Sequence, residues 1–398
     1  MELKFSQDDI FSYAVADQVG IDDAKKRIDA GEVLHVKLGI DPTSANIHIG
    51  RAIVLWRLRA FQELGHKIEL IIGDFTGQVG DTSDKDSERP MLSEEQVTEN
   101  MARYEEQLWM VLNPERKDQV TFHHNSTWLN SLSLGKISHL ADAFSVNTFI
   151  KRELVAKRLE KGGRVSLREM LYPLMQGYDS IAVEADVELG GTDQWFNLLA
   201  GRTLQEQAGK RQQAIIVNPL VSGMDGRKMS SSYGNGIFLL DTPKDKFGKF
   251  MTLRDDLMAD FLIVFPQPAL PFTKEELATR IASGENPRDI KLDMSERLVA
   301  LYHGEDVAKT TRQEYMNQFS EKQLPTDIPE LHVEGSEISI VDLLIVSTFA
   351  KSKTEARQLV REGAVKFNNE KVTDTEAVVA IESGSLLQVG PRRYVKLI

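Results

Sequence analysis

Two neighbouring segments place polar side chains where a strand gives way to a helix. Gly39-Ile40-Asp41-Pro42-Thr43 ends a short apolar run, and His48-Ile49-Gly50-Arg51 opens a stretch of helical spacing. A helix start presents free N–H groups and a partial positive charge, which suits a phosphate. Gly50 would let a flat ring approach the backbone closely. A nucleotide site is one interpretation; a His that only caps or packs a helix is the commoner alternative.

A second segment, Gly226-Arg227-Lys228-Met229-Ser230-Ser231-Ser232, carries cations and hydroxyl groups between further glycines at 223, 234 and 236. Glycines on both sides predict a mobile loop, and its basic and hydroxyl side chains suit a pyrophosphate group. A solvated linker between domains is the alternative interpretation. The chain has no Gly-x-x-x-x-Gly-Lys-Ser/Thr run, so a nucleotide would not be held in a P-loop.

Three polar residues, Tyr172, Gln176 and Asp179, are spaced by four and three positions. This spacing places them on one face of a helix, while Leu171, Met175 and Tyr178 take another face and are expected to pack on the core. Buried polar groups are costly unless they are paired. The three residues therefore predict either a ligand site or an internal polar cluster that satisfies itself.

The fourth candidate is the run Gly190-Gly191-Thr192-Asp193-Gln194-Trp195. A Gly-Gly turn at a strand end, followed by Asp and Gln at a helix start, would suit a ribose and an amino acid. An ordinary Asp helix cap is the alternative.

A framework of strands and helices must bring these four segments together. Apolar runs predict short buried strands at residues 34–40, 68–73, 120–123 and 214–217. Helical spacing predicts helices at residues 51–64, 93–112, 137–159, 166–178 and 193–208. Strands alternating with helices predict an α/β fold with a doubly wound, mostly parallel sheet, where ligands bind at the carboxyl ends of the strands.

The strand signal fades after residue 236. Helices are predicted at residues 244–265, 274–281, 287–303 and 305–319, and a Pro-containing linker at 323–329. The last segment predicts two short helices at 339–348 and 354–362. A hairpin-like run at 364–372 follows them, with Asn368-Asn369 as its turn.

Composition limits the class of protein. The 398 residues include no Cys, so a disulfide framework and a thiolate metal site are excluded. The first thirty residues lack the pattern of a signal or transit peptide, and no apolar run approaches the ~20 residues of a membrane span, so a cytoplasmic protein is predicted. The net charge of −12 argues against whole-surface attraction to nucleic acid. Residues 336–398, with nine Lys and Arg against eight Asp and Glu, are a candidate local exception.

In this order and spacing, the four segments resemble the class I aminoacyl-tRNA synthetases. His48-Ile49-Gly50-Arg51 looks like their HIGH motif, and Lys228-Met229-Ser230-Ser231-Ser232 looks like KMSKS. Two departures stand out: Arg51 replaces the last His of the first motif, and Ser231 replaces the second Lys of the second. Arg51 still offers donors and adds a permanent charge, while Ser231 leaves Lys228 as the main cation of the loop.

Within that class, the Tyr172-Gln176-Asp179 pattern and the Gly-Gly-x-Asp-Gln run are similar to the tyrosine enzymes. The resemblance implies a Rossmann-type catalytic domain that makes tyrosyl-adenylate from tyrosine and ATP, with Mg²⁺ accompanying the ATP, and then charges tRNA(Tyr). The implied catalytic residues are Thr43, His48, Arg51, Lys228 and Ser232. The implied ATP-binding residues are Gly39, Asp41, Gly50, Gly191 and Asp193, with Lys228. The implied tyrosine-binding residues are Lys37, Thr76, Asp81, Tyr172, Gln176, Asp179 and Gln194, of which Asp179 would accept the phenol hydrogen bond. Lys37 stands where many tyrosine enzymes carry a Tyr, so its ammonium would either pair with Asp179 or point elsewhere.

The resemblance also implies a domain plan. The catalytic domain would span residues 1–236, a helical anticodon-facing domain 237–325, and a small α+β RNA-binding domain of the S4 type 336–398. Lys351, Lys353, Arg357 and Arg361 would contact tRNA phosphates there, and no dedicated metal cage is expected. Family members are usually homodimers, and the apolar stretch 137–150 is the expected interface.

Three rival functions remain. The tryptophan enzyme shares the fold and both phosphate motifs, although an indole has no hydroxyl to satisfy Asp179. A non-catalytic RNA-binding protein on the same scaffold would fit the departures at Arg51 and Ser231, but not the retention of His48 and Lys228. An enzyme that passes tyrosyl-adenylate to an acceptor other than tRNA would leave the C-terminal segment without a purpose.

Overall fold

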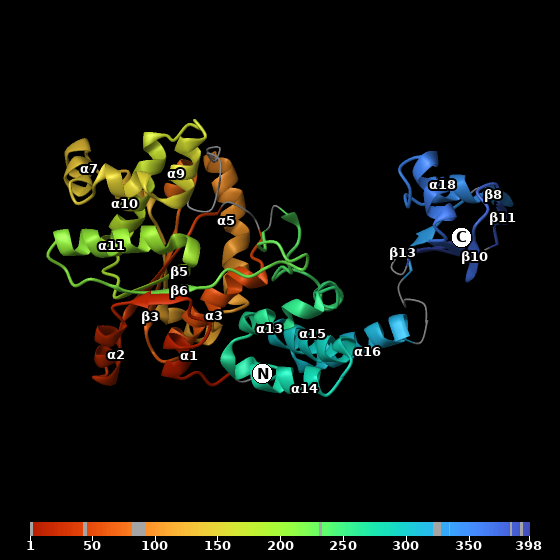
Figure 1. The fold of residues 1–398 in the computed structure, drawn as a ribbon, viewed down its shortest axis with the longest axis horizontal. Coiled ribbons are helices and arrows are strands. Elements are labelled where there is room, and N and C mark those ends of the chain that lie inside the picture. Colours follow the sequence, from red (N-terminus) through yellow and green to blue (C-terminus); the bar gives the residue numbers. More distant parts are fainter. Residues whose placement is uncertain are drawn as a thin grey trace. The chain divides into compact units, whose positions relative to one another are not determined.

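A computed structural model describes residues 3–42, 46–81, 93–230, 233–320, 328–333, 335–382, 384–390 and 393–398. Its contacts divide the chain into two compact units, Met1–Arg312 and Gln313–Ile398 (Figure 1). The first unit holds all four segments singled out above. The finer boundaries expected near residues 236, 325 and 336 stay predictions.

The first unit is built on a six-stranded sheet with the order β1-β6-β5-β2-β3-β4. The strands are β1 (Asp17–Val19), β2 (His35–Ile40), β3 (Lys67–Ile72), β4 (Val120–His124), β5 (Val187–Gly191) and β6 (Ala214–Asn218). All run parallel except β1, which pairs antiparallel with β6 at the edge. The predicted doubly wound parallel sheet is confirmed. Chain order reverses between β2 and β5, the kind of switch point at which such sheets bind ligands.

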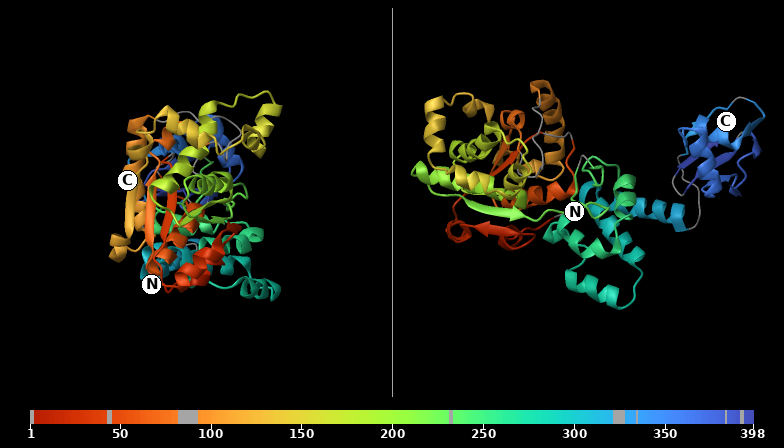
Figure 2. Two further views of the ribbon diagram at one scale, coloured as in Figure 1. Left: turned by 90° about the vertical axis from the view of Figure 1, so that its left-hand side faces the viewer. Right: turned by 45° about the horizontal axis from the view of Figure 1, so that its top comes forward.

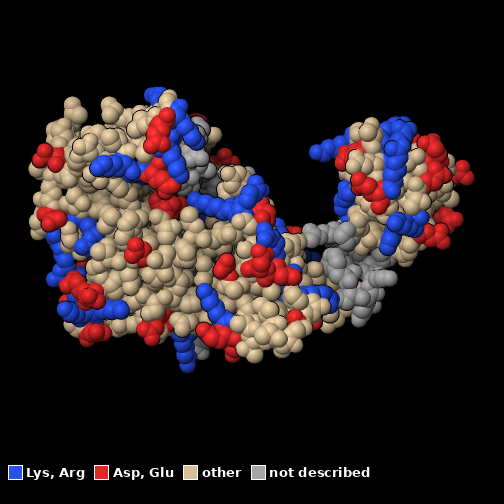
Figure 3. Space-filling view, in the orientation of Figure 1, with Lys and Arg blue, Asp and Glu red and all other residues tan. Residues whose placement is uncertain are grey.

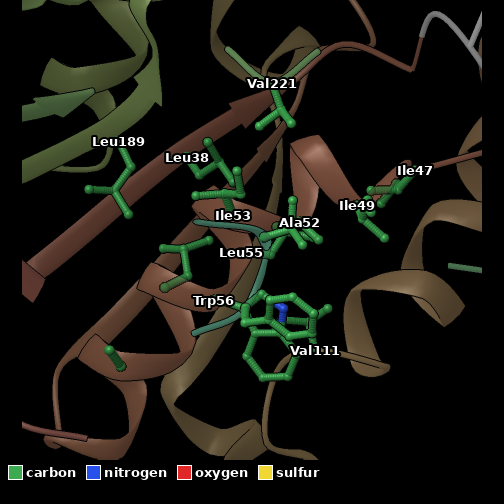
Figure 4. Close-up of a cluster of buried hydrophobic side chains, with 14 of the residues drawn as sticks. Leu38, Ile47, Ile49, Ala52, Ile53, Leu55, Trp56, Val111, Leu189 and Val221 are labelled. Atoms are coloured by element: carbon green, nitrogen blue, oxygen red, sulfur yellow. The ribbon is translucent and has the colours of Figure 1, made fainter. Parts of the chain in front are cut away.

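Helices cover both faces of this sheet (Figures 1 and 2). Helices α1 (Gln7–Phe11) and α3 (Ile49–Glu63) lie on one face, and α10 (Leu167–Ala182) and α11 (Trp195–Gln207) on the other. Side chains alternate along each strand. Val36 and Leu38 of β2 therefore join the core around α3, whereas Lys37 between them faces α10. Figure 4 shows Leu38 and Leu189 above Ile53 and Trp56 of α3, the apolar packing that fixes this helix on the sheet.

Shorter elements connect this framework: α2 (Ile21–Asp29), α4 (Thr76–Val79), α5 (Glu94–Trp109), η1 (Pro114–Gln119), α6 (Ser126–Leu129), α7 (Leu134–Ala141), α8 (Val146–Ile150), α9 (Glu153–Glu160) and η2 (Thr192–Gln194). The single helix expected over 137–159 was wrong, because the chain breaks into α7, α8 and α9. Ser145 and Arg152 take non-helical backbone conformations at the two breaks, and a new helix begins after each of them. Leu171, expected to pack on the core, is instead exposed.

The rest of the first unit is helical: α12 (Pro243–Phe250), η4 (Asp255–Leu257), α13 (Met258–Phe261), η5 (Leu262–Val264), η6 (Gln267–Ala269), α14 (Lys274–Ala282), α15 (Pro287–His303) and α16 (Glu305–Ser320), the last running into the second unit. The predicted helices at 274–281, 287–303 and 305–319 are confirmed. The continuous helix expected at 244–265 was wrong. Its aromatic residues Phe247, Phe250, Phe261 and Phe265 are all fully buried, so the apolar density reflected burial rather than one long helix face.

The second unit packs α17 (Ile340–Val346) and α18 (Lys353–Arg361) on a small sheet of order β10-β9-β12-β13-β7. Its strands are β7 (Glu330–Leu331), β9 (Val365–Phe367), β10 (Glu370–Val372), β12 (Leu386–Val389) and β13 (Arg393–Leu397), and β8 (Glu337–Ser339) pairs with β11 (Val378–Ala380). The predicted hairpin is confirmed. Asn368 and Asn369 turn it with φ of 48° and 67°, a conformation that Asn tolerates better than most residues.

Candidate active site

A cavity of about 310 Å³ opens at the carboxyl edge of the main sheet. Residues from the ends of five strands and from the loops that follow them line it: Gly39 in β2 and Asp41 just after it, Gly73 after β3, Asn125 after β4, Gly190 and Gly191 in β5, and Asn218 in β6. The predicted site residues that also line it are His48, Gly50, Arg51, Thr76, Asp81, Tyr172, Gln176, Asp179, Asp193, Gln194 and Lys228. The structure therefore brings all four candidate segments to one cavity. Thr43 and Ser232 lie outside the described residues.

His48 is the N-cap of α3, and its Nδ1 accepts the backbone N–H of Arg51 at 3.2 Å. The proton of the neutral ring must then sit on Nε2, which leaves that atom as a donor. Burial, reinforced by the cations of Arg51 and Lys228, lowers the pKa of His48 to about 3. The imidazole is therefore neutral at physiological pH, and it offers a hydrogen bond rather than a charge.

A side chain at position 50 would be crowded by the neighbouring residues. A Cβ there would lie 3.1 Å from Nδ1 of His48 and 3.4 Å from the sulfur of Met229. Met229 is almost fully buried and lies beside Gly50. Its side chain therefore packs the Lys228 loop against the segment that contains His48. Backbone pairing strengthens this joint, since Ile49 N–H donates to Ile237 O at 2.9 Å and Leu239 N–H to Ile47 O at 2.9 Å.

Lys228 lies at the mouth of the cavity. Its ammonium reaches Asp193 at 3.3 Å, and its side chain remains 40% exposed. Asn235 braces the loop, since its amide donates to Lys228 O at 3.2 Å and accepts Ser230 N–H at 3.0 Å. Arg51, also exposed, reaches the hydroxyl of Tyr104 from α5 at 3.2 Å. This end of the cavity therefore combines cations with a neutral His donor.

The opposite end is closed by buried hydrogen bonds around Asp179. Its carboxylate accepts Trp128 Nε1–H at 2.8 Å and Asn125 Nδ2–H at 3.3 Å. Asn125 also donates to Thr76 Oγ1 at 3.0 Å. The Thr76 hydroxyl in turn donates to Asp41 at 2.8 Å. The Asn125 amide therefore links the Asp179 carboxylate directly, and the Asp41 carboxylate through Thr76. These hydrogen bonds restrict the rotation of both carboxylates.

Tyr172 completes this wall by donating its hydroxyl to the other oxygen of Asp41 at 2.8 Å. Burial and the nearby carboxylates hold the pKa of Tyr172 well above its usual value, so it stays a donor. Burial also raises the pKa of Asp179 to about 7, although Lys37, Trp128 and Asn125 oppose the shift. Nearby, Gln194 Nε2 donates to Asp81 at 2.7 Å, which places another carboxylate in the cavity wall.

Sequence reasoning missed Asn125 and Trp128. Asn125 is fully buried and lies in the cavity wall, and the one available signal was its position directly after β4 at the carboxyl edge of the sheet. Lys37, by contrast, does not line the cavity. Its ammonium pairs with Glu188 at 2.8 Å behind α10, so of the two expected alternatives it points elsewhere.

Lys351, Lys353, Arg357 and Arg361 are all exposed on or just before α18. Lys353 pairs with Asp342 at 2.9 Å. Figure 3 shows basic side chains gathered on the α18 side of this unit and acidic ones toward β8 and β11. This separation gives residues 336–398, with nine Lys and Arg against eight Asp and Glu, a locally basic face.

The described residues hold neither a metal-binding cluster nor a membrane-spanning helix. No group of three or more His, Asp or Glu side chains within these residues is arranged to hold a metal ion. Within the same described ranges, no helix is both long and apolar enough to span a bilayer.

Comparison with known proteins identifies the family. Residues 29–320 match the family described as tRNA synthetases class I (W and Y), and residues 320–385 match the Tyrosine–tRNA ligase SYY-like C-terminal domain. A Tyrosine–tRNA ligase of Moorella thermoacetica is 42% identical over 378 residues, covering 94% of this chain and 90% of the relative. A second, from Mannheimia succiniciproducens, is 40% identical and covers 100% of this chain and 97% of its own length.

Solved structures agree on the fold. The tyrosyl-tRNA synthetase of Archaeoglobus fulgidus, complexed with L-tyrosine, superposes with a TM-score of 0.60 at 20% identity, covering 76% of this chain and 98% of that one. The mitochondrial enzyme of Aspergillus nidulans gives 0.61 at 21% identity, over 77% and 91%. With both family matches and near full-length relatives at this identity, the chain belongs to the class I tRNA synthetase family of the tyrosine and tryptophan enzymes.

Proposed function

We propose that this protein is a tyrosine–tRNA ligase that activates tyrosine with ATP and transfers the tyrosyl group to tRNA(Tyr). The observation that carries the proposal is Asp179, a buried carboxylate held by Trp128 and Asn125 at the closed end of a cavity whose mouth is cationic. A phenol hydroxyl would donate a further hydrogen bond to this carboxylate, whereas an unsubstituted phenyl ring has no donor to offer it.

The first step is an in-line displacement at phosphorus. The carboxylate oxygen of tyrosine forms a bond to the α-phosphate of ATP, and the bond to the bridging oxygen breaks, releasing pyrophosphate. His48, through Nε2–H, and Lys228 are placed at the mouth to neutralise charge that develops on the phosphates. Arg51 adds a third donor there. Thr43 and Ser232 would assist by resemblance.

Binding roles follow the two ends of the cavity. The tyrosine ring and ammonium would lie between Asp179 and a set of polar groups, namely Thr76, Asp81, Tyr172, Gln176 and Gln194. Adenosine would lie over Gly39, Asp41, Gly50, Gly191 and Asp193. No side chain is needed as a covalent nucleophile, so positioning and electrostatics supply the catalysis.

Mg²⁺ would arrive with ATP. The two carboxylates assigned to ATP binding are engaged, Asp41 by Thr76 and Tyr172, and Asp193 by Lys228. The phosphates themselves would therefore supply most ligands of the ion, as Mg²⁺ sites on nucleotides commonly do.

In the second step a ribose hydroxyl at the 3′ end of tRNA attacks the tyrosyl carbonyl, and AMP leaves. Lys351, Lys353, Arg357 and Arg361 offer the basic face that would meet tRNA phosphates, a contact that sets position rather than sequence. Because tRNA charging serves translation, we place the protein in the cytoplasm.

A homodimer is part of the proposal. Helices α7 to α10 carry large apolar side chains in solvent, among them Leu134, Val146, Leu167 and Leu171. Such a concentration is typical of a protein interface. Sedimentation of the wild type as a dimer, and of Val146→Asp with Leu167→Asp as a monomer, would support this assignment; a wild-type monomer at micromolar concentration would contradict it.

The test of the activity is exchange of labelled pyrophosphate into ATP, with tyrosine, tryptophan and phenylalanine run side by side. We expect exchange with tyrosine alone, followed by charging of tRNA(Tyr). Exchange with tryptophan instead would reassign the substrate. A folded protein that exchanges with none of the three in the presence of Mg²⁺ would overturn the enzyme assignment.

A further inference from the structure

A buried ion pair lies behind the cavity, outside the residues that line it. Lys37 of β2 and Glu188 of β5 are register partners in the parallel sheet, and both are fully buried. They lie on the sheet face that α10 covers. Among the described ion pairs of the chain, this is the only Lys–Glu contact in which both side chains are fully buried. The distance from Lys37 Nζ to Glu188 Oε1 is 2.8 Å.

Lys37 uses its whole hydrogen-bonding capacity in this position. Its ammonium donates to Glu188, to the backbone O of Gln176 at 2.8 Å and to Ser180 Oγ at 2.7 Å. An ammonium has three N–H donors, so all three are engaged. Two of the three acceptors belong to α10, on either side of Asp179.

Glu188 holds the same stretch of α10 from the next strand. Its carboxylate accepts Gln176 Nε2–H at 3.3 Å and the Ser180 hydroxyl at 3.2 Å, and Gln213 donates to it as well. Lys37 and Glu188, both on strands, therefore form hydrogen bonds with the backbone and side chain of Gln176 and with the side chain of Ser180. These positions precede and follow Asp179 on the helix.

Stability alone is a poor reason for such a pair. Desolvating two charges offsets much of their attraction, and apolar side chains of similar size are often as good or better at such a site. What an apolar pair cannot do is hold α10 at one rotation and height against the sheet through directed bonds.

We propose that Lys37 and Glu188 form a positioning pair that fixes the Gln176–Ser180 turn of α10, and through it the discrimination between tyrosine and phenylalanine. The inference rests on the proposed function, because it concerns how Asp179 meets the phenol. Lys37 acts on the substrate only through Asp179 and Gln176. Its positive charge also favours the ionised form of Asp179, against the opposing charge of Glu188.

The test compares Lys37→Met with Arg158→Met. Arg158 is also buried and pairs with Glu169 at 2.9 Å, on the first turn of the same helix but away from the cavity. Each variant removes a cation that contacts a buried carboxylate, Glu188 or Glu169, so both should lower the Tm. We expect only Lys37→Met to raise the tyrosine KM in pyrophosphate exchange, by about tenfold, and to lower the tyrosine-over-phenylalanine ratio of kcat/KM by a similar factor. The ATP KM should stay within about twofold in both variants.

The double variant Lys37→Met with Glu188→Gln separates position from stability. It also removes the buried negative charge of Glu188, so it should recover the Tm while the tyrosine KM stays raised, and it carries the test if Lys37→Met does not fold. In Lys37→Met the acid limb of kcat/KM for tyrosine should also move to higher pH, because loss of the ammonium raises the pKa of Asp179 further. In the double variant, loss of the Glu188 charge opposes that shift.

Recovery of both Tm and tyrosine KM in the double variant, or equal kinetic effects of Lys37→Met and Arg158→Met, would overturn the inference and leave a purely structural pair. A wild-type protein that shows no tyrosine-dependent exchange would instead overturn the proposed function, and that outcome is read before any variant is compared.

Discussion

The two ends of the cavity are built on opposite principles. At the closed end, Asp179, Asn125 and Thr76 are nearly or fully buried and are bound to one another before any ligand arrives. At the mouth, Arg51 is exposed, and Lys228 keeps 40% of its side chain in solvent with an ion pair of 3.3 Å. The same cavity therefore joins a rigid recognition wall to a solvated set of cations.

This difference fits the two tasks. Recognition of one hydroxyl group requires an acceptor that cannot relax or recruit water when the hydroxyl is missing, so burial strengthens it. Pyrophosphate must leave the site after the reaction, so the cations that stabilise it should be able to move with it. A loop flanked by glycines, such as the one that carries Lys228, allows this movement. Substitutions at the closed end should therefore alter selectivity between amino acids, and substitutions at the mouth should alter the reaction rate or the KM for ATP.

The largest effect is expected for Lys228→Ala. Removing a donor aimed at developing charge typically lowers kcat by about 100- to 1,000-fold, and the tyrosine KM should change little. Pyrophosphate exchange measures both. Arg227→Ala is the matched control, because Arg227 is the neighbouring cation but pairs with Asp225 at 2.6 Å. Similar losses in the two variants would mean that the general charge of the loop, and not Lys228, supports the reaction.

Asp179→Asn should alter amino-acid selectivity, because Asp179 lies at the closed end of the cavity. A hydrogen bond to a charged acceptor contributes about 1.5–3 kcal/mol, so the preference for tyrosine over phenylalanine should fall by about 10- to 100-fold. The measurement is the ratio of kcat/KM for the two amino acids. An unchanged ratio would remove Asp179 from the recognition wall.

The pH dependence of stability should report the same carboxylate. Burial raises the pKa of Asp179 from 3.8 to about 7, so between these values the folded state holds a proton that the unfolded state has lost. Its contribution to the free energy of unfolding is therefore full below pH ~4 and is lost as pH rises through about 7, by about 1.4 kcal/mol per pH unit.

Urea unfolding of wild type and Asp179→Asn at pH 5 and pH 8 isolates this contribution. The variant should gain stability relative to wild type at the higher pH. Tyrosine binding by wild type should strengthen as pH rises through about 7, because the ionised carboxylate is the stronger acceptor for a hydrogen bond from the phenol hydroxyl. An equal difference in stability between variant and wild type at pH 5 and at pH 8 would show that Asp179 is already ionised in the folded protein at pH 5.

Part of the fold could be predicted from local sequence patterns. The apolar runs of β2, β3, β4 and β6 and the capped helix α15 were predictable because each satisfies one local rule. The strand β1 was not predicted, since three residues on a sheet edge, two of them polar, carry no alternation. The run from α7 to α9 was misjudged, because helical spacing continues across the two breaks and only backbone geometry reveals them.

The site divides in the same way. Segments with a local signature, such as the His48 helix start and the Tyr172 to Asp179 face, were predicted and lie in the cavity. Asn125 and Glu188 were not predicted, because their importance comes from partners across the sheet rather than from their neighbours in sequence. The position of Lys37 behind α10 likewise depends on which face of β2 meets that helix, a tertiary fact.

The smallest effect is expected for Arg51→Ala. Arg51 is exposed, and interactions of solvated charges are screened over about 8 Å at physiological ionic strength. We expect the ATP KM to rise by about threefold at low salt and the difference to shrink at high salt, with Arg51→Lys close to wild type. A salt-independent loss of about 100-fold or more would place Arg51 directly on a reacting phosphate. The mouth would then hold a fixed, preorganised cation like the donors of the closed end, and the contrast between the two ends would reduce to burial alone.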